Sequence, residues 1–378
     1  MADNGARGHR PKRESAQAVS TLDASETVSI SKPQPAEGLV VAIAHGFFEV
    51  AASGETILCT IRGRLRKSQP HPSRSRPQAG GARMPRSQRV GSIPSATATT
   101  SVADRDTSDS PARIAPGDHV RLTRLGAGRG IIEDVLPRHA SLSRARSGSG
   151  GEQVMLANLD HAVLVFAVRE PTPHFGMLDR YLALCEHAGI PVTICLNKVD
   201  LEVGSEVSYE VGVYQDLGYR TLYTSAATKE GIEALRAELE GRTSLLTGPS
   251  GVGKSSLLNV LMPGVDQRTG EISDSTGKGR HTTTGVRLLP LEGGGWVADS
   301  AGIRELALWN VPSTALVRAF VELRPYSSSC LYENCDHSEN EEGCALHEVL
   351  ASGRITMERW SSFLRLLAEA RETEAPTW

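Results

Sequence analysis

The sequence predicts a multidomain chain of three parts: a small N-terminal β-barrel, a parallel α/β unit and a C-terminal α-rich unit. The apolar pattern changes twice along the chain, and each change marks a boundary. Short alternating runs occur up to Leu136, whereas continuous apolar runs alternate with helical spacings from Ala162 to Ala298. That second pattern is typical of a parallel sheet covered by helices. After residue 310, helical spacing surrounds a cluster of cysteines.

Five short strands are expected in the first part, and turn residues such as Gly46 separate them. They are Leu39–Ala44, Phe47–Ala52, Thr56–Leu65, His119–Leu125 and Gly130–Leu136. This number of strands favours an OB-like barrel over residues 38–140. Residues 1–37 and 67–115 lack a sustained apolar period, which predicts a disordered N-terminal tail and a low-complexity basic insertion within the barrel.

A Ser/Gly/Arg-rich stretch, residues 141–151, reads as a linker to an α/β unit over residues 152–310. The strands expected there are Ala162–Val168, Pro191–Leu196, Thr221–Thr224, Ser244–Thr247 and Trp296–Ala298. Helical spacing lies between most of them, as in Phe175–His187, Ile232–Leu239 and Lys254–Leu261. Residues 311–378 form the third part, with helices expected at Ala315–Leu323 and Met357–Ala370.

Charge is divided unevenly along the 378 residues, although the net charge is only -3. Residues 1–150 hold 22 Lys and Arg against 13 Asp and Glu, a net of +9, and the remainder has a net of -12. The basic part suggests a polyanion partner, and the alternative is a solvated tail and loop with no specific role. No apolar stretch reaches the ~18–20 residues of a membrane span, and residues 1–37 do not resemble a secretory signal. We therefore expect a cytoplasmic protein with no membrane contact.

A complete phosphate-binding motif follows the predicted strand Ser244–Thr247. The pattern G-x-x-x-x-G-K-[ST] is matched by Gly248, Pro249, Ser250, Gly251, Val252, Gly253, Lys254 and Ser255, with Ser256 next in the helix. Glycines let successive backbone N–H groups turn toward phosphate oxygens, and the following helix adds its N-terminal dipole. Lys254 should reach the β- and γ-phosphates, and Ser255 should ligate Mg²⁺.

A second motif selects the base. It comprises Asn197, Lys198, Val199 and Asp200, at the carboxyl end of a predicted strand. A carboxylate there can accept two hydrogen bonds from the N1–H and N2–H₂ edge of guanine, a donor pair that adenine lacks. Ser225 and Ala226 end the next strand, and the Ala226 N–H could reach the guanine O6. An ATP-dependent kinase remains an alternative only if Asp200 plays no part in base choice.

The order of these motifs is unusual, because the base motif precedes the phosphate loop and the D-x-x-G motif comes last, at Asp299–Gly302. The motifs resemble those of the GTPase superfamily, in which the phosphate loop comes first, and the order here corresponds to a circular permutation of the same sheet. Together with the segment Gly279–Thr284, the OB-like barrel and a final Cys/His cluster, it makes the chain resemble the RsgA (YjeQ) family over about residues 38–370. Two features depart from the family: Ala301 stands where Pro is usual, and the insertion 67–115 is longer than expected.

The resemblance implies GTP hydrolysis, with GTP, GDP and Mg²⁺ bound, during late maturation of the small ribosomal subunit. The subunit would stimulate turnover. Asp299 would hold Mg²⁺ through water, the Gly302 N–H would contact the γ-phosphate, and Thr283 and Thr284 would cap the γ-phosphate and Mg²⁺. Ile303 occupies the position where Ras-like enzymes orient water with Gln, so His281 is our candidate for that role.

Two other functions remain open at this stage. One is a non-catalytic RNA-binding assembly chaperone whose affinity is switched by GTP, which Ile303 makes conceivable. The other is a permuted GTPase that serves the large subunit, against which the OB-like and cysteine-rich flanks argue.

A metal site is expected in the C-terminal part. Cys330, Cys335, His337 and Cys344 supply three thiolates and one imidazole, which complete the tetrahedral shell of one structural Zn²⁺. His347 is a lower-ranked substitute ligand. The family resemblance strengthens this assignment.

The barrel is the expected RNA-binding part. Arg62, Arg64, Arg66 and Lys67 leave its third strand in an alternating run, so the three arginines should share one face. Such contacts favour phosphate and give salt-dependent affinity with little sequence specificity. The expected partners are the small ribosomal subunit and its 16S-type rRNA, and the chain itself should be a monomer.

Overall fold

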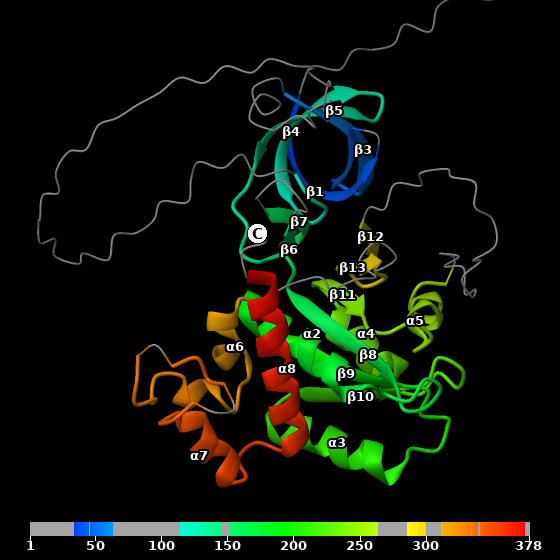
Figure 1. Ribbon diagram of the computed structural model, residues 1–378. Coiled ribbons are helices and arrows are strands. Elements are labelled where there is room, and N and C mark those ends of the chain that lie inside the picture. The colour runs from blue at the N-terminus through cyan, green and yellow to red at the C-terminus, as the bar shows by residue number, and fades with distance from the viewer. Residues whose placement is uncertain are drawn as a thin grey trace, which may run out of the picture.

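The computed structural model describes residues 34–44, 46–62, 114–145, 152–263, 286–299, 311–333, 335–338 and 341–374 (Figure 1). Most of the predicted tail and insertion, and the segments 264–285 and 300–310, lie outside these residues.

A closed five-stranded barrel forms the N-terminal unit, in the strand order β1-β2-β3-β5-β4. The strands are β1 (Gln34–Ala44), β2 (Phe47–Ala52), β3 (Glu55–Ile61), β4 (His119–Gly126) and β5 (Arg129–Val135). Neighbours pair antiparallel except β3 and β5, which are parallel. Alternate residues such as Val50, Ile57, Val120 and Ile132 fill the interior. The sequence therefore predicted the OB-like barrel correctly.

The edges of the barrel correct two predicted boundaries. β1 begins at Gln34, so the last four residues assigned to the tail pair with β4. Ile114 and Ala115, assigned to the insertion, are buried, and the Ala115 N–H donates to buried Asp118 at 2.8 Å. Strand pairing with β4 explains the first difference, and burial with a side-chain hydrogen bond explains the second; composition reveals neither.

A hairpin links the barrel to the α/β unit where the sequence predicted a linker over residues 141–151. β6 (Ser141–Ala145) pairs antiparallel with β7 (Glu152–Ala157). Buried Leu142 and Leu156 pair across this hairpin, and its apolar side joins the main core. The Ser- and Arg-rich composition of residues 141–145 conceals this short alternation.

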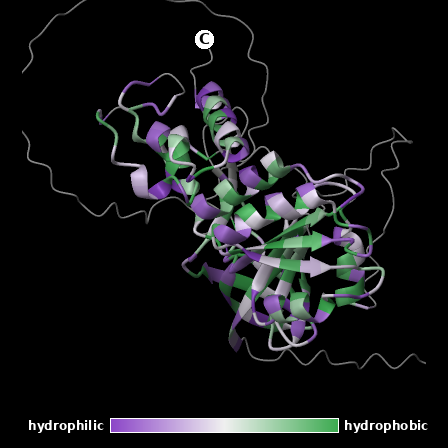
Figure 2. Ribbon diagram, turned by 90° about the horizontal axis from the view of Figure 1, so that it is seen from below, coloured by the Kyte–Doolittle hydropathy of each residue, from purple (hydrophilic) through white to green (hydrophobic). Residues whose placement is uncertain are grey.

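A six-stranded sheet in the order β10-β9-β8-β11-β13-β12 forms the α/β unit. Its strands are β8 (His161–Ala167), β9 (Val192–Asn197), β10 (Arg220–Thr224), β11 (Thr243–Thr247), β12 (Arg287–Pro290) and β13 (Trp296–Asp299). All neighbours are parallel except β12 and β13. Mostly apolar residues line the central strands (Figure 2), and every residue of β8 is buried.

Helices cover both faces of this sheet (Figure 1). α2 (Phe175–Ala188) and α3 (Ser205–Asp216) pack on one face with the C-terminal helices, in a core that includes Leu164 and Phe166. α4 (Ile232–Leu239) and α5 (Lys254–Leu261) pack on the other, in a core that includes Val163 and Val165.

The C-terminal unit contains α6 (Ser313–Ala319), a 3₁₀ turn (Arg324–Tyr326), α7 (Ala345–Ala351) and α8 (Met357–Glu374). α8 lies along α2, and a buried ion network joins them. Arg359 of α8 donates to Asp179 of α2 at 2.6 Å and to both carboxylate oxygens of Glu322.

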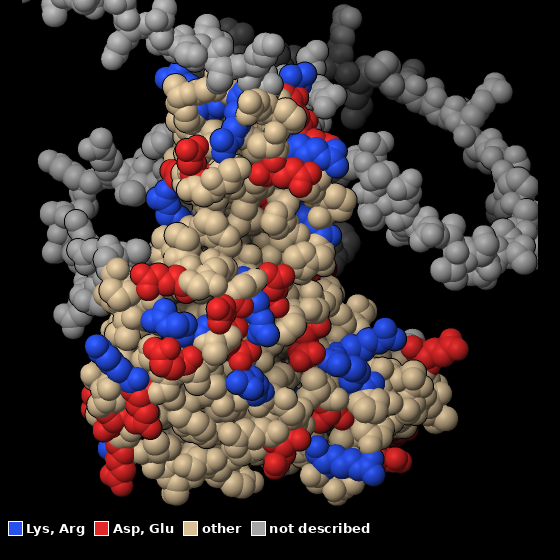
Figure 3. Space-filling view, turned by 180° about the vertical axis from the view of Figure 1, so that it is seen from behind, with Lys and Arg blue, Asp and Glu red and all other residues tan. Residues whose placement is uncertain are grey.

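The outer surface carries charges of both signs, interspersed on the face shown in Figure 3. Within the described residues, none of the helices combines the length and hydropathy required to cross a lipid bilayer.

Candidate nucleotide site and metal centre

The phosphate-binding motif joins the carboxyl end of β11 to the first turn of α5. Gly248, Gly251 and Gly253 all adopt positive φ, and other atoms approach Gly248 and Gly253 closely. A Cβ on Gly248 would lie 2.0 Å from the Val165 carbonyl oxygen, and one on Gly253 would lie 2.3 Å from Asn197 Nδ2. Gly248 and Gly253 are therefore required by both conformation and space, and Gly251 by conformation. Pro249, Ser250 and Val252 complete the loop between them.

Lys254 and Ser255, the predicted phosphate and Mg²⁺ contacts, begin α5, and Ser256 follows them in its first turn. Lys254 Nζ donates to the carbonyl oxygens of Gly248 and Pro249, at 2.8 and 2.6 Å. These bonds hold the ammonium group within the loop that should surround a phosphate. The three side chains are half-buried, as required of groups that meet a ligand from solvent.

Asn197 connects the base motif to the phosphate loop. Its side chain is buried at the end of β9, and Nδ2 donates to the Val252 carbonyl oxygen at 2.8 Å. Its Oδ1 accepts from the Thr224 hydroxyl of β10 at 3.2 Å. The two predicted motifs, which start 51 residues apart in sequence at Asn197 and Gly248, therefore lie side by side.

The remaining base-motif residues form a connected cluster. The Ser225 hydroxyl donates to Asp200 Oδ1. This hydrogen bond orients the Asp200 side chain, which is otherwise exposed to solvent. The Val199 N–H donates to the Thr224 carbonyl, and Ala226 follows Ser225 at the end of β10. Lys198 Nζ donates to the Glu170 carbonyl. The sequence motifs did not identify Glu170 and gave the Thr224 hydroxyl no role, because a backbone acceptor and a strand hydroxyl carry no pattern.

Of the residues predicted to act in GTP hydrolysis, the structure describes only Asp299. Asp299 ends β13, next to the phosphate-loop strand β11, where its backbone pairs with Arg287. His281, Thr283, Thr284 and Gly302 lie outside the described residues.

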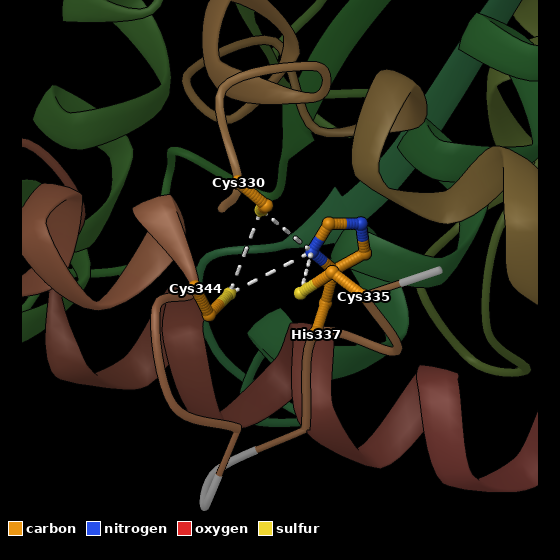
Figure 4. Close-up of side chains that lie close together, drawn as sticks. All are labelled: Cys330, Cys335, His337 and Cys344. Carbon is orange, nitrogen blue, oxygen red and sulfur yellow. Dashed lines mark hydrogen bonds between the residues drawn. The ribbon is translucent and has the colours of Figure 1, made fainter. Parts of the chain in front are cut away.

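Four predicted metal ligands converge in the C-terminal unit (Figure 4). The Sγ atoms of Cys330, Cys335 and Cys344 lie 3.5, 3.5 and 3.6 Å from His337 Nδ1. Cys330 Sγ and Cys344 Sγ are 4.0 Å apart, about twice a disulfide bond. Tetrahedral zinc, with Zn–S of ~2.3 Å and Zn–N of ~2.0–2.1 Å, would place sulfur about 3.8 Å from sulfur and about 3.5 Å from nitrogen. The arrangement therefore fits a metal of this kind.

Burial favours the neutral forms of two of these groups when no metal is bound. Burial and the neighbouring thiols raise the pKa of Cys344 to about 12, and burial lowers the pKa of His337. A metal ion would reverse the first effect, because it stabilises the thiolate. His347, the substitute ligand, instead has its Nε2 at 3.1 Å from the Ser338 carbonyl oxygen and is not one of the four convergent groups.

Of the predicted RNA-contacting residues, only Arg62 is described. Arg64, Arg66 and Lys67 lie outside the described residues. The Arg62 guanidinium pairs with Glu133 of β5 at 2.5 Å, with the arginine side chain 53% exposed. Its charge is thus partly neutralised. Arg121 and Arg129, which the sequence analysis did not select, are exposed on β4 and β5.

A phosphate loop, a guanine-type base motif and the D-x-x-G strand at one sheet edge, with the base motif first in the chain, define a circularly permuted P-loop GTPase. The RsgA GTPase family model matches residues 135–309. The chain belongs to this family and is a GTPase, which confirms the resemblance inferred from its motifs. Membership implies a guanine nucleotide and Mg²⁺.

Relatives and solved structures agree with this assignment. The small ribosomal subunit biogenesis GTPase RsgA of Gemmatimonas aurantiaca is 44% identical over 261 residues, which cover 68% of this chain and 84% of that protein. The RsgA of Moorella thermoacetica is 42% identical over 259 residues, which cover 68% and 86%. The crystal structure of YjeQ from Thermotoga maritima matches with a TM-score of 0.65 and 27% identity, covering 89% of this chain and 99% of that one. YloQ, described as a circularly permuted GTPase, shares the fold with a TM-score of 0.62 and 22% identity, covering 91% of this chain and 98% of that one.

Proposed function

We propose that this chain hydrolyses GTP to drive or check late maturation of the small ribosomal subunit. The observation that carries the proposal is the 44% identity, over most of both chains, to a protein named for biogenesis of that subunit. The closed barrel supports it, because OB folds bind nucleic acid through a strand face and flanking loops. The proposed partner is the subunit with its 16S-type rRNA, bound by a cytoplasmic monomer.

Within the nucleotide site, we assign roles by position. The phosphate-loop N–H groups and Lys254 would hold the phosphates, and Ser255 and Asp299 would hold Mg²⁺. Asp200 would accept the guanine N–H groups, with Ser225 fixing its carboxylate through the bond described above. These contacts position the γ-phosphate, and the Mg²⁺ ion would neutralise charge that develops on it.

We assign the positioning of the attacking water to His281, since the side chain of Ile303 cannot hydrogen-bond water. Thr283 and Thr284 would cap the γ-phosphate and Mg²⁺, and the Gly302 N–H would contact the γ-phosphate. His281→Ala should cut turnover about 100-fold or more, the usual scale for a general acid–base group, with nearly unchanged nucleotide affinity. Equal turnover in the variant would remove His281 from the mechanism.

A structural zinc would be held by Cys330, Cys335, His337 and Cys344. The convergence of three sulfurs and one nitrogen within 4.8 Å supports this assignment. When bound, zinc would contribute folding free energy to the segment between the 3₁₀ turn and α7, which supplies all four ligands and has little regular structure. Arg62, Arg64, Arg66 and Lys67 would contact rRNA phosphate at the barrel surface.

GTP turnover with and without purified small subunits tests the proposed function. We expect turnover to rise severalfold or more with small subunits and to stay at the basal rate with large subunits. Stimulation by large subunits alone would favour the large-subunit alternative. Tight GTP binding with no turnover under any condition would favour a non-catalytic assembly chaperone.

A further inference from the structure

We propose that an exposed apolar tip on the C-terminal unit, formed by Leu331 and Tyr332, docks onto a basic protein surface of the small ribosomal subunit rather than onto its RNA. The proposal rests on the proposed function, which supplies the subunit as partner.

Leu331 and Tyr332 are consecutive and strongly exposed. Their exposed fractions are 72% and 53%, and Leu331 is the most exposed large apolar side chain among the described residues. Single exposed apolar residues are common on protein surfaces. An exposed Leu directly beside an exposed Tyr is less common. Tyrosine is also enriched among the residues that dominate protein–protein binding energy.

The backbone around this tip is fixed on both sides. The Leu331 N–H donates to the Gly343 carbonyl at 3.0 Å, and the Cys335 N–H donates to the Tyr332 carbonyl at 3.2 Å. A Cβ on Gly343 would lie 2.8 Å from Leu331 Cβ, so glycine permits this close approach. Cys330, a candidate metal ligand, directly precedes the tip. A preorganised tip loses little conformational entropy on binding, which favours affinity.

Charge around the tip identifies the class of partner. Residues 325–353 contain no Lys or Arg and six acidic residues: Glu333, Asp336, Glu339, Glu341, Glu342 and Glu348. Of these, Glu333, Asp336, Glu342 and Glu348 are exposed, and Asp336 is paired with Arg371 of α8 at 3.6 Å. Three thiolates around one Zn²⁺ would add a further negative charge. Such a surface repels phosphate and complements a positively charged protein segment.

The barrel, the part that we expect to bind RNA as OB folds do, lies at the other end of the molecule (Figure 1). It exposes Arg62, which pairs with Glu133, Arg121, which pairs with Glu37 and Asp134, and Arg129. One molecule can therefore place its barrel on RNA while its C-terminal tip meets protein, and the two contacts would fix its orientation on the subunit.

The test uses the full, zinc-loaded chain with Leu331→Ser and Tyr332→Ser combined. Affinity is measured for intact small subunits and for small-subunit rRNA stripped of protein. We expect about tenfold or greater loss for subunits and less than about twofold change for stripped rRNA, since truncation of a central aromatic anchor has effects of this size. Tyr209→Ser, on α3 with Tyr209 67% exposed, is the matched control and should change neither affinity. Zinc content verifies that the variants are folded.

A charge reversal separates protein from RNA as the partner. Glu333→Lys with Glu342→Lys should weaken subunit binding if the partner is a basic protein segment. Stronger subunit binding, or an equal loss of stripped-rRNA affinity in the Leu331/Tyr332 variant, would overturn the proposal in favour of an RNA contact. If the wild-type chain binds subunits and all variants bind them equally, the docking proposal alone fails. If the wild-type chain shows no affinity for subunits, the proposed function fails with it.

Discussion

The Asn197 side-chain amide donates to the backbone carbonyl of Val252 at 2.8 Å, and so the base motif physically supports the phosphate loop. This bond is buried, and Thr224 fixes the amide from the opposite side. Base recognition and phosphate recognition are therefore coupled through one side chain.

Asn197→Ala should weaken binding of GTP and GDP alike, because it leaves the Val252 carbonyl without its buried donor. A buried unsatisfied group costs about 1–3 kcal/mol, which corresponds to roughly 5- to 150-fold in affinity. Titration with fluorescent GDP measures this. Asn158→Ala is the control: Asn158 is also buried and bonded to backbone, but in the link to the barrel. It should lower stability and leave nucleotide affinity unchanged; wild-type affinity in Asn197→Ala would contradict the coupling.

Breaking the ion network between α8 and α2 should destabilise the protein strongly. The side chains of Arg359, Asp179 and Glu322 are at most 4% exposed, so Arg359→Met would leave two buried carboxylates without their cation. The expected loss in free energy of unfolding is about 3–5 kcal/mol. Arg180→Met, which removes the more exposed pair with Glu369, should cost about 1 kcal/mol or less. Similar losses of unfolding free energy in denaturant melts of both variants would show that the buried network contributes no more than the exposed pair.

The sequence predicted best those elements whose apolar pattern lies within a single helix or strand. Ile232–Leu239 and Lys254–Leu261 match α4 and α5 residue for residue, because each carries a clear apolar face next to glycine. The pattern did not delimit β12, whose four residues include Arg287 and Pro290, or α7, which directly follows Cys344. α3 was also missed, since Gly212 and several polar residues interrupt its apolar positions.

The candidate site shows the same limit. Motif spacing identified the phosphate loop, the base motif and the four convergent metal ligands. It could not indicate that Asn197 bonds Val252, or that Arg359 meets Asp179 across 180 residues of sequence. Charged residues on helices are expected to face solvent, and only tertiary packing reveals that these two do not.

Stability should fall with acid in a window set by His161. This histidine is buried at the start of β8, where burial lowers its pKa from 6.5 to about 4, with Glu238 opposing and Arg242 and Arg220 adding to the shift. The unfolded chain therefore binds more protons than the folded chain between those pH values. The contribution of neutral His161 to the free energy of unfolding is present in full above about pH 6.5 and is lost as pH falls toward 4. The slope should reach about 1.4 kcal/mol per pH unit, or about 3 kcal/mol in all.

Urea melts from pH 7.5 to 4.5 measure this loss in the wild-type chain and in His161→Gln, which keeps an amide near Thr193 but has no titrating group. The difference in unfolding free energy between the two proteins should change across the window. A difference that is independent of pH would exclude His161 as the source. His139→Gln, at an exposed histidine, should retain the wild-type dependence.

Removal of metal should partly unfold the C-terminal unit. The four ligand side chains come from a segment with little regular structure between the 3₁₀ turn and α7, so packing alone gives it little support. Without the ion, burial raises the pKa of the Cys344 thiol and lowers the pKa of His337, which favours the neutral form of each, and the sulfur and the ring nitrogen lie 3.6 Å apart. We expect one zinc per chain, a lower Tm after chelation and recovery of the Tm on adding Zn²⁺.

Cys330→Ser should lose the zinc. Cys59→Ser should retain it, because Cys59 is buried in the barrel. A chelated protein with unchanged Tm would show that the convergence of these groups does not depend on a metal.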